Sequence, residues 1–366
     1  SVSIVSGRVD ASREPLVPSR LLLRGSRPED VVARTRVLFQ EQETGPGALH
    51  PALMGAQPGD GISRIVPTVG DGYPHTSLSV TAFKSYLECP YRFWLKHVMS
   101  LRDLDDRALE LDAARFGTMV HAVLERYGSE EELRDCADKE RIRRYLGSFL
   151  DDYVAQQFGE NARRTVAIQA TLARRRLEAF APRQAERVEA GWRTVAVEHR
   201  VGREDELVSL PVPGGDFYVH GRIDRVDLHE DGTLAVLDYK TSSRVPDADH
   251  RKGPRNDKTW VNLQLPLYRR LASTIAVPHS SVVTGYALLP RDPSRSGFFL
   301  ADWDDELLKE ADELAVQVAS SIRSGVFWPP SEQPPMYSES LAGICQDAAL
   351  NASPIVSPTT DVEGAV

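Results

Sequence analysis

The spacing of apolar residues changes near Arg193 and divides the chain into a helical part and a mixed part. Helical signals dominate from about residue 79 to residue 190, and one predicted helix begins with Thr118 as its cap and runs through Tyr127. Alternating apolar and polar residues then predict short strands over 194–201, 217–228 and 233–239, with Pro and Gly between them. The pattern therefore predicts a small sheet that follows a large helical insertion.

The last third of the chain completes a predicted α/β core. A helix over about 264–272, a strand near 281–289 and a long amphipathic helix over about 302–324 follow the sheet strands. Several acidic residues begin that last helix, where the helix dipole favours negative charge. Much of the acidic excess of this region therefore has a structural explanation.

The ends of the chain carry weaker patterns. Residues 28–42 predict a short helix, whereas residues 43–75 contain many Gly and Pro with little periodicity and predict a linker. Residues 76–345 hold the predicted core and its insertion, and residues 346–366 are expected to form a flexible tail.

Composition narrows the class of protein. The 366 residues are 41% hydrophobic and 27% charged, which is typical of a globular protein and excludes disorder throughout. No apolar run approaches the roughly 18 residues of a membrane-spanning helix, and the first residues do not resemble a secretory signal. We therefore expect a cytoplasmic protein without a membrane partner.

The net charge of −9 is unevenly distributed along the chain. Residues 301–366 hold twelve acidic and two basic side chains, a net of −10, so residues 1–300 carry a net charge of +1. Arginines over 141–176 and basic residues over 251–258 each form a candidate basic surface. Either group is a solvated face or a phosphate groove, and the sequence does not choose between them.

A predicted hairpin carries the most informative polar residues. Asp238 and Lys240 are two residues apart, so their side chains leave the same face of a strand. If Glu230–Gly232 form a three-residue turn, Asp224 lies directly opposite Asp238. Two carboxylates at the end of an apolar stripe repel each other and are costly to desolvate, and a divalent cation resolves that conflict.

The chemistry that this hairpin predicts is phosphodiester hydrolysis. Carboxylate oxygens suit Mg²⁺ or Mn²⁺, and Lys240 beside them can hold or deprotonate an attacking water. Alone, however, an Asp-x-Lys pair is more often an ion pair on the surface of a hairpin. Further residues are needed to decide between the two interpretations.

Other polar residues support the metal interpretation without deciding it. His121 is expected in the first turn of its helix, where the dipole disfavours an imidazolium and leaves a neutral imidazole that can bind a metal. Gln264 and Tyr268 share one helix face and can donate hydrogen bonds to a strand or to the lysine region. Glu198 either contacts the metal through water or is solvated, and Asp227 is expected to face solvent.

Five motifs in order resemble the RecB/AddB-type nuclease domain of the PD-(D/E)XK superfamily. They run from Ser79 to Phe93, which contains Cys89-Pro90, and continue with Gly117–His121, Gly221–Asp227, Leu237–Thr241 and Gln264–Tyr268. The resemblance implies a mixed central sheet flanked by helices and a metal-dependent DNA nuclease. It also implies that the metal ligands are His121, Asp224, Asp238 and the carbonyl of Tyr239, and that Lys240 assists the water.

The resemblance also suggests a cellular setting. Residues 1–42 look like the end of the helicase-like region that precedes this domain in AddB-type subunits. The chain would then be the C-terminal part of a longer protein that resects double-strand DNA ends with an ATP-driven, AddA-like helicase-nuclease partner. A stand-alone RecB-like defence nuclease, or a catalytically silent module that binds DNA ends or acts as a scaffold, is the alternative.

One departure from the family concerns cysteine. Many related members bind an iron-sulfur cluster through four cysteines, whereas only Cys89 and Cys345 match here, so we expect no cluster. Residues 327–330 with Leu341 and Ile344 are expected instead to form an apolar clamp that holds the C-terminal segment against the helix ending at Cys89.

Overall fold

The computed structural model describes residues 28–39, 67, 73–101, 111–159, 162–202, 207–254, 257–331 and 341–345. The chain divides into two compact units, Ser1–Ser63 and Arg64–Val366. The described part of the first unit is helix α2 (Pro28–Phe39), where the sequence predicted a helix. The rest of the expected helicase-like segment, most of the expected linker and the expected tail lie outside the described residues.

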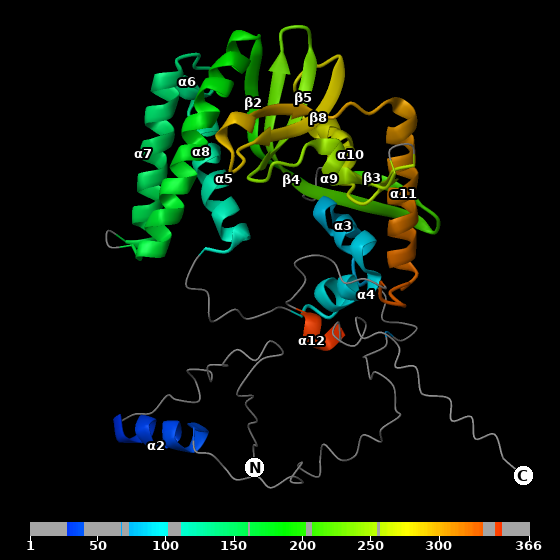
Figure 1. Cartoon of the computed structure of the whole chain (residues 1–366). Coiled ribbons are helices and arrows are strands. Elements are labelled where there is room, and N and C mark those ends of the chain that lie inside the picture. Colours follow the sequence, from blue (N-terminus) through cyan, green and yellow to red (C-terminus); the bar gives the residue numbers. More distant parts are fainter. Residues whose placement is uncertain are drawn as a thin grey trace, which may run out of the picture. The chain divides into compact units, whose positions relative to one another are not determined.

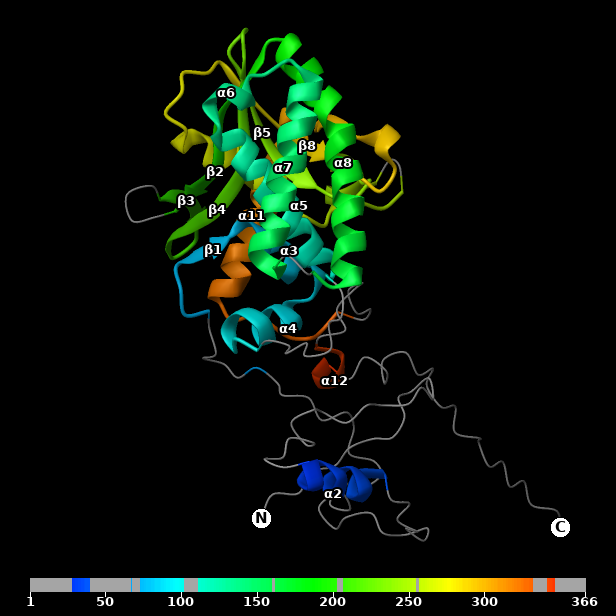
Figure 2. The ribbon, with the colours of Figure 1, turned by 90° about the vertical axis from the view of Figure 1, so that its left-hand side faces the viewer.

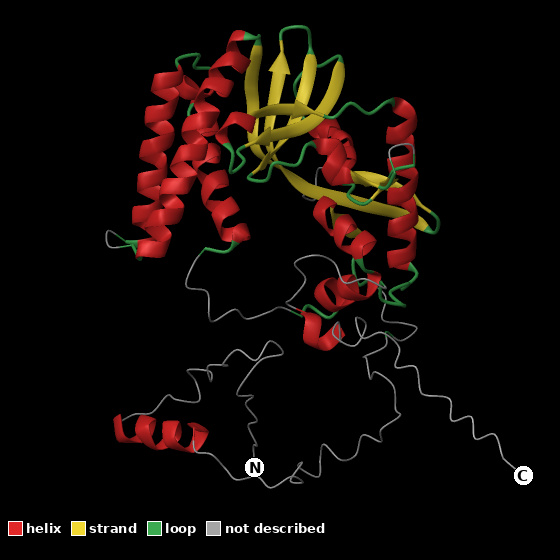
Figure 3. Ribbon diagram, in the orientation of Figure 1, coloured by secondary structure: helices red, strands yellow, loops and turns green. Residues whose placement is uncertain are grey.

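A mixed sheet forms the centre of the second unit (Figures 1 and 3), and seven of the described strands belong to it. They are β1 (Ser77–Ser79), β2 (Trp192–Val201), β3 (Val208–Val212), β4 (Gly215–His229), β5 (Thr233–Lys240), β8 (Ser281–Leu288) and β9 (Gly297–Leu300). The order is β1-β4-β5-β8-β9, and β2 and β3 also pair with the long strand β4. The pairs β1–β4 and β5–β8 are parallel and the others antiparallel, which confirms the mixed sheet.

Helices supply most of the remaining described structure. They are α3 (Val80–Glu88), α4 (Pro90–Phe93), a π-helix (Trp94–Val98), α5 (Ala113–Ser129), α6 (Glu131–Arg134), α7 (Lys139–Phe158), α8 (Arg164–Glu189), α9 (Pro246–His250), α10 (Gln264–Leu271), α11 (Asp305–Arg323) and α12 (Ala342–Cys345). Single 3₁₀ turns cover Ala272–Thr274 and Pro293–Arg295, and β6 (Arg251–Lys252) pairs with β7 (Thr259–Trp260). No helix among these residues is both long and apolar enough to cross a bilayer.

The helices form a layer on each face of the sheet (Figures 1 and 2). The predicted insertion, α5 to α8, packs on one face around a core that includes Tyr239, Ala287 and Leu289 of the sheet. Helices α3, α10 and α11 pack on the other face around a second core that includes Val236 and Tyr286. Alternate residues of β5 therefore enter different cores, as the two-residue period of a strand requires.

The hairpin between β4 and β5 has the predicted register. Leu228 pairs with Leu234, and Arg225 pairs with Leu237, which leaves a three-residue turn at residues 230–232. Gly232 has φ of +87°, a left-handed conformation that glycine adopts without steric cost. The register thus brings Asp224, inside β4, opposite Asp238, near the end of β5.

Asp227 is fully buried, so the prediction that it faces solvent is wrong. It lies in the middle of β4, which has β2 on one side, β5 on the other and the insertion above it. Its carboxylate accepts hydrogen bonds from Arg187 Nε and Arg225 Nε, both at 2.6 Å, and from the Thr194 hydroxyl at 3.0 Å. These donors compensate the charge that burial strips of water.

The C-terminal segment is held against α3 and α4 largely as expected. Phe327 is buried and packs against Tyr86 and Phe93, with ring centroids 6.5 and 6.0 Å apart, and the Tyr86 hydroxyl donates to the Val326 carbonyl at 2.6 Å. Leu341 is buried in the same core, but Ile344 is 41% exposed, so its place in the clamp was predicted wrongly. A single turn of helix, α12, turns only part of its surface toward the core.

Candidate active site

Acidic residues from the neighbouring strands β2, β4 and β5 converge near the C-terminal end of β5. We call Glu198, Asp224 and Asp238 the acidic edge. The β4–β5 register continues one step beyond Arg225 and Leu237 and brings Asp224 opposite Asp238. On the other side of β4, the register of β2 brings Glu198 opposite Asp224, because Val197 pairs with Arg225 and His199 with Ile223. Asp224 and Asp238 are buried, and the Glu198 side chain is 8% exposed. The sheet alone therefore places three carboxyl groups in a row.

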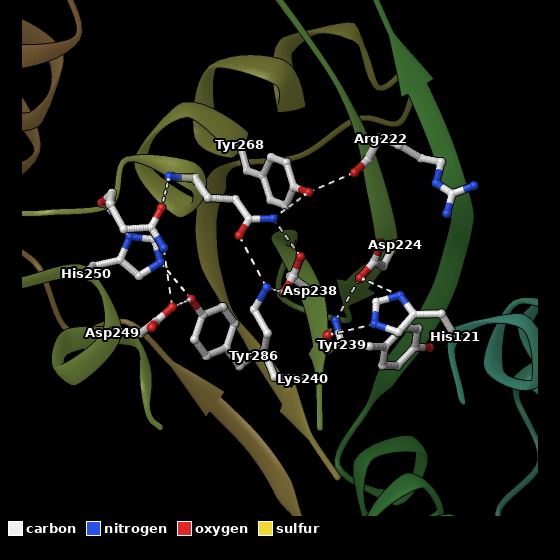
Figure 4. Close-up of polar contacts among 12 residues, drawn as sticks. His121, Arg222, Asp224, Asp238, Tyr239, Lys240, Asp249, His250, Tyr268 and Tyr286 are labelled. Atoms are coloured by element: carbon white, nitrogen blue, oxygen red, sulfur yellow. Dashed lines mark hydrogen bonds and ion pairs between the residues drawn. The ribbon is translucent and has the colours of Figure 1, made fainter. Parts of the chain in front are cut away.

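Lys240 lies beside Asp238 on the same face of β5 (Figure 4). Its ammonium is 2.5 Å from Asp238 Oδ2 and donates a hydrogen bond to Gln264 Oε1 at 3.3 Å. Burial lowers the pKa of Lys240, but the charge of Asp238 outweighs it, so the net pKa is raised. The side chain is 28% exposed and remains a cation that solvent can reach.

Asp224 is held by the backbone of the neighbouring strand. The Tyr239 backbone N–H donates to Asp224 Oδ2 at 2.9 Å. Burial, followed by the nearby charge of Asp238, raises the pKa of Asp224 well above its ordinary value. Two buried carboxylates that lie opposite each other repel when both are ionised, and a bound cation would stabilise both as anions.

His121 reaches the site from the insertion layer (Figure 4). Its Nε2 is 2.9 Å from the Tyr239 carbonyl oxygen, and its Nδ1 is 3.4 Å from Asp224 Oδ2. The helix begins at Ala113 with Asp112 as its cap, so His121 lies in the third turn, and its predicted place in a first turn is wrong. Burial, not the helix dipole, lowers the pKa of the imidazole and keeps it neutral.

Gln264 and Tyr268 lie together on the first turns of α10 and face the acidic edge. Gln264 Nε2 donates to Asp238 Oδ1 at 2.8 Å and to the Tyr268 hydroxyl at 3.0 Å, and that hydroxyl donates to the Arg222 carbonyl at 2.8 Å. Pro266 is accommodated in the first turn, where its missing N–H has no helical acceptor. The amide of Gln264 thus contacts both Asp238 and Lys240.

Glu198 lies beside Asp224 in the site. The sequence left open whether it lies at the metal site or is solvated. Its carboxylate is 2.5 Å from Arg222 Nε, yet neither of its oxygens has a hydrogen-bond partner among the described residues. Burial raises the pKa of Glu198 to about 7. Its backbone has φ of +48°, an uncommon conformation for glutamate. In the sequence, only its position among apolar residues of a predicted strand indicated that Glu198 is buried.

These side chains suit a divalent cation. One ligand atom each from His121, Glu198 and Asp224 lies within 4.8 Å of the others, whereas Asp238 lies opposite Asp224 and is paired with Lys240. The 2.9 Å between His121 Nε2 and the Tyr239 carbonyl oxygen is near the separation of about 3 Å between neighbouring ligands of an octahedral ion bound at about 2.1 Å. The carboxylate and carbonyl oxygens of this group are the ligands that Mg²⁺ and Mn²⁺ prefer.

A buried network beneath Lys240 was not anticipated from the sequence. The Tyr286 ring lies 5.3 Å from the Lys240 ammonium, and its hydroxyl donates to Asp249 Oδ2 at 2.9 Å. His250 Nε2 is 2.8 Å from the same hydroxyl, and His250 Nδ1 donates to the Asn262 carbonyl at 2.7 Å. The parallel pairing of β8 with β5 aligns Tyr286 with Asp238, and such pairing between distant segments leaves no local signal in the sequence.

Known proteins resemble this chain over part of its length. One subunit of the ATP-dependent helicase/deoxyribonuclease of Clostridium perfringens is 27% identical over 181 residues, which cover 46% of this chain and 16% of that protein. The exonuclease/helicase subunit RexB of Lactococcus lactis is 24% identical over 174 residues, which cover 45% of this chain and 15% of that protein. The matched region thus spans about a sixth of the length of these relatives.

One solved structure and one family profile also match the chain. A protein from Eubacterium rectale described as an exonuclease superposes with a TM-score of 0.38 and 10% identity, covering 73% of this chain and 90% of that one. The profile of the PD-(D/E)XK nuclease superfamily matches residues 77–346, which contain the whole sheet and every residue of the acidic edge. The chain therefore belongs to the PD-(D/E)XK nuclease superfamily, whose members use divalent metals.

Proposed function

We propose that this chain is a divalent-metal-dependent DNA nuclease that hydrolyses phosphodiester bonds at the edge formed by β2, β4 and β5. The observation that carries the proposal is the meeting of Asp224 and His121 at the Tyr239 backbone, with Asp238 opposite Asp224 on the neighbouring strand and the Lys240 ammonium 2.5 Å from Asp238. His121 is more than 100 residues from the β4–β5 hairpin in the sequence, so local chain geometry does not explain why it meets these groups.

The metal ligands in this proposal are Asp224, Asp238, His121 and the Tyr239 carbonyl oxygen, and Glu198 supplies a further carboxylate. Mg²⁺ or Mn²⁺ held by these residues would supply Lewis acidity at the phosphoryl group and would lower the pKa of water. The neutral imidazole of His121 leaves a nitrogen lone pair available, and its lowered pKa preserves that state near neutral pH.

Lys240 orients the water and stabilises charge on the phosphoryl group. Its raised pKa keeps it protonated, so it donates hydrogen bonds and does not remove a proton. Asp238 and Gln264 fix the ammonium from two sides, and Gln264 in turn is fixed by Tyr268. In the reaction the water oxygen bonds to phosphorus, the bond to the leaving oxygen breaks, and the proton released by water balances the one that the leaving oxygen takes up.

The relatives suggest a wider setting for this reaction. Their names describe subunits of ATP-dependent helicase/deoxyribonucleases, so we propose that this chain processes DNA double-strand ends for recombinational repair together with an ATP-driven helicase subunit. A stand-alone nuclease would need no such subunit. Cleavage of linear DNA by the purified chain, with and without added helicase and ATP, separates the two arrangements.

The direct test uses the 366-residue chain with linear single-stranded DNA and Mg²⁺. We expect short products from the wild-type chain, and a loss of at least about 10²-fold in rate for Asp238→Ala, because that change removes both a metal ligand and the partner of Lys240. Asp231→Ala is the matched control, since Asp231 is an exposed carboxylate on the turn of the same hairpin. We expect it to cut DNA at the wild-type rate.

Calorimetry with Mn²⁺ provides a second readout that does not depend on activity. We expect saturable binding to the wild-type chain and to Asp231→Ala, and none to Asp238→Ala. Cleavage that survives Asp238→Ala would remove the site assignment. Wild-type protein that neither binds Mn²⁺ nor cuts DNA would indicate a scaffolding module.

A further inference from the structure

An open groove includes Lys240 in its lining. Its volume is about 890 Å³, near the upper end of the range of roughly 300–1,000 Å³ that is usual for ligand pockets. The lining comes from α3, the start of α5, the loop after β5, α9 and the loop after β8. The charged members of that lining are Lys84, Lys240, Arg244, Asp249, Arg291, Asp292 and Arg295.

The groove is positively charged although the chain as a whole carries −9. Five basic side chains and two carboxylates line it, a net of +3. Both carboxylates are already engaged: Asp249 accepts from the Tyr286 hydroxyl at 2.9 Å, and Asp292 accepts from the Ser294 N–H at 3.1 Å. Asp249 also lies 3.8 Å from Arg244 and offsets part of its charge, so the excess of three positive charges in the lining sets the sign of the field.

Two of the cations form no close ion pair within the part of the chain that the structure describes. Neither Lys84 nor Arg291 makes a hydrogen bond or a salt bridge with another described residue, although one lies on α3 and the other follows β8. Some positive side chains of the insertion are paired instead. Arg143 pairs with Glu140 at 2.6 Å, and Arg126 pairs with Asp152 at 2.7 Å. The groove thus gathers cations from distant segments and leaves these two available to a ligand.

We propose that this groove binds the phosphodiester backbone of the DNA strand next to the bond that is cut. The inference rests on the proposed function, because Lys240 belongs to both the groove and the catalytic edge. A phosphate at Lys240 is followed along the strand by further phosphates, and a row of cations beside the site meets them in turn. Contacts of this kind recognise the backbone and not the base sequence.

The binding test uses Lys84→Ala/Arg291→Ala and a fluorescein-labelled oligothymidylate of about 20 nucleotides in EDTA, where no cleavage occurs. Each phosphate contact contributes about 0.7 to the slope of log K against log salt for a single strand, so we expect the double variant to lose about 1.4 from that slope. The matched control is Arg143→Ala/Arg144→Ala on α7, which removes the same charge from a pocket of the insertion. We expect it to keep the wild-type slope.

A kinetic test separates failure of the groove from failure of the proposed function. In Mg²⁺ we expect Lys84→Ala/Arg291→Ala to raise KM by about tenfold and to leave kcat within about twofold of wild type, since two phosphate contacts are lost and the catalytic edge is intact. Equal salt slopes for the two double variants would refute the proposal that the groove binds the DNA backbone. If the wild-type chain cuts no DNA but Lys84→Ala/Arg291→Ala still weakens oligonucleotide binding, the proposed function is wrong and the groove remains a DNA-binding site.

Discussion

Removing the buried carboxylate of Asp227 should destabilise the protein severely. Asp227 is fully buried and lies between two guanidinium groups, each donating from Nε at 2.6 Å. The side chains of Arg187 and Arg225 are 7% and 3% exposed, so solvent cannot replace the lost partner. Breaking a buried ion pair from one side costs about 3–5 kcal/mol. Because two cations lose their counterion here, we expect Asp227→Ala to cost about 4–5 kcal/mol.

Equilibrium unfolding in urea, followed by circular dichroism, measures this loss. With a slope of about 3 kcal/mol per molar urea, the midpoint should fall by about 1.3–1.7 M. Asp231→Ala, on the exposed turn of the same hairpin, should change stability by less than about 1 kcal/mol. If the two variants lose the same small amount, the Asp227 cluster behaves as a solvated ion pair and the argument from burial is refuted.

Two further predictions concern the clamp and the acidic edge. Phe327→Ala should lower the free energy of unfolding by about 3–5 kcal/mol, because it leaves a cavity in a buried site against Tyr86 and Phe93. Urea unfolding measures this loss, and an unchanged midpoint would contradict the prediction. The raised pKa of Glu198, about 7, means that the folded state holds a proton that the unfolded state has released by about pH 4.5. In EDTA, stability should therefore fall between about pH 4.5 and pH 7, by up to about 3 kcal/mol relative to Glu198→Gln, and parallel profiles for the two proteins would contradict it.

The sequence alone predicted the strands β2, β4, β5 and β8 and the hairpin between β4 and β5. Alternating residues around the Glu230–Gly232 turn predicted two strands in a register that the structure confirms, because a period of two and a glycine with positive φ are local properties of the chain. The helical insertion was predicted because helical periodicity and capping residues are also local properties of the chain. The start of the helix that holds His121 was not, because Asp112 competes with Thr118 as a cap and only the three-dimensional backbone shows which one accepts the N–H.

Tertiary structure decided which polar residues are buried and which meet. Asp227 looks like a solvent-facing strand residue until α8 covers β4, and Glu198 is ambiguous until β2 pairs with β4 and turns it toward Asp224. Tyr286 and Arg291 reach Lys240 through the parallel pairing of β8 with β5. A sequence records periodicity within a segment, whereas burial and charge pairing depend on which segments pack against each other, and that is a property of the folded chain alone.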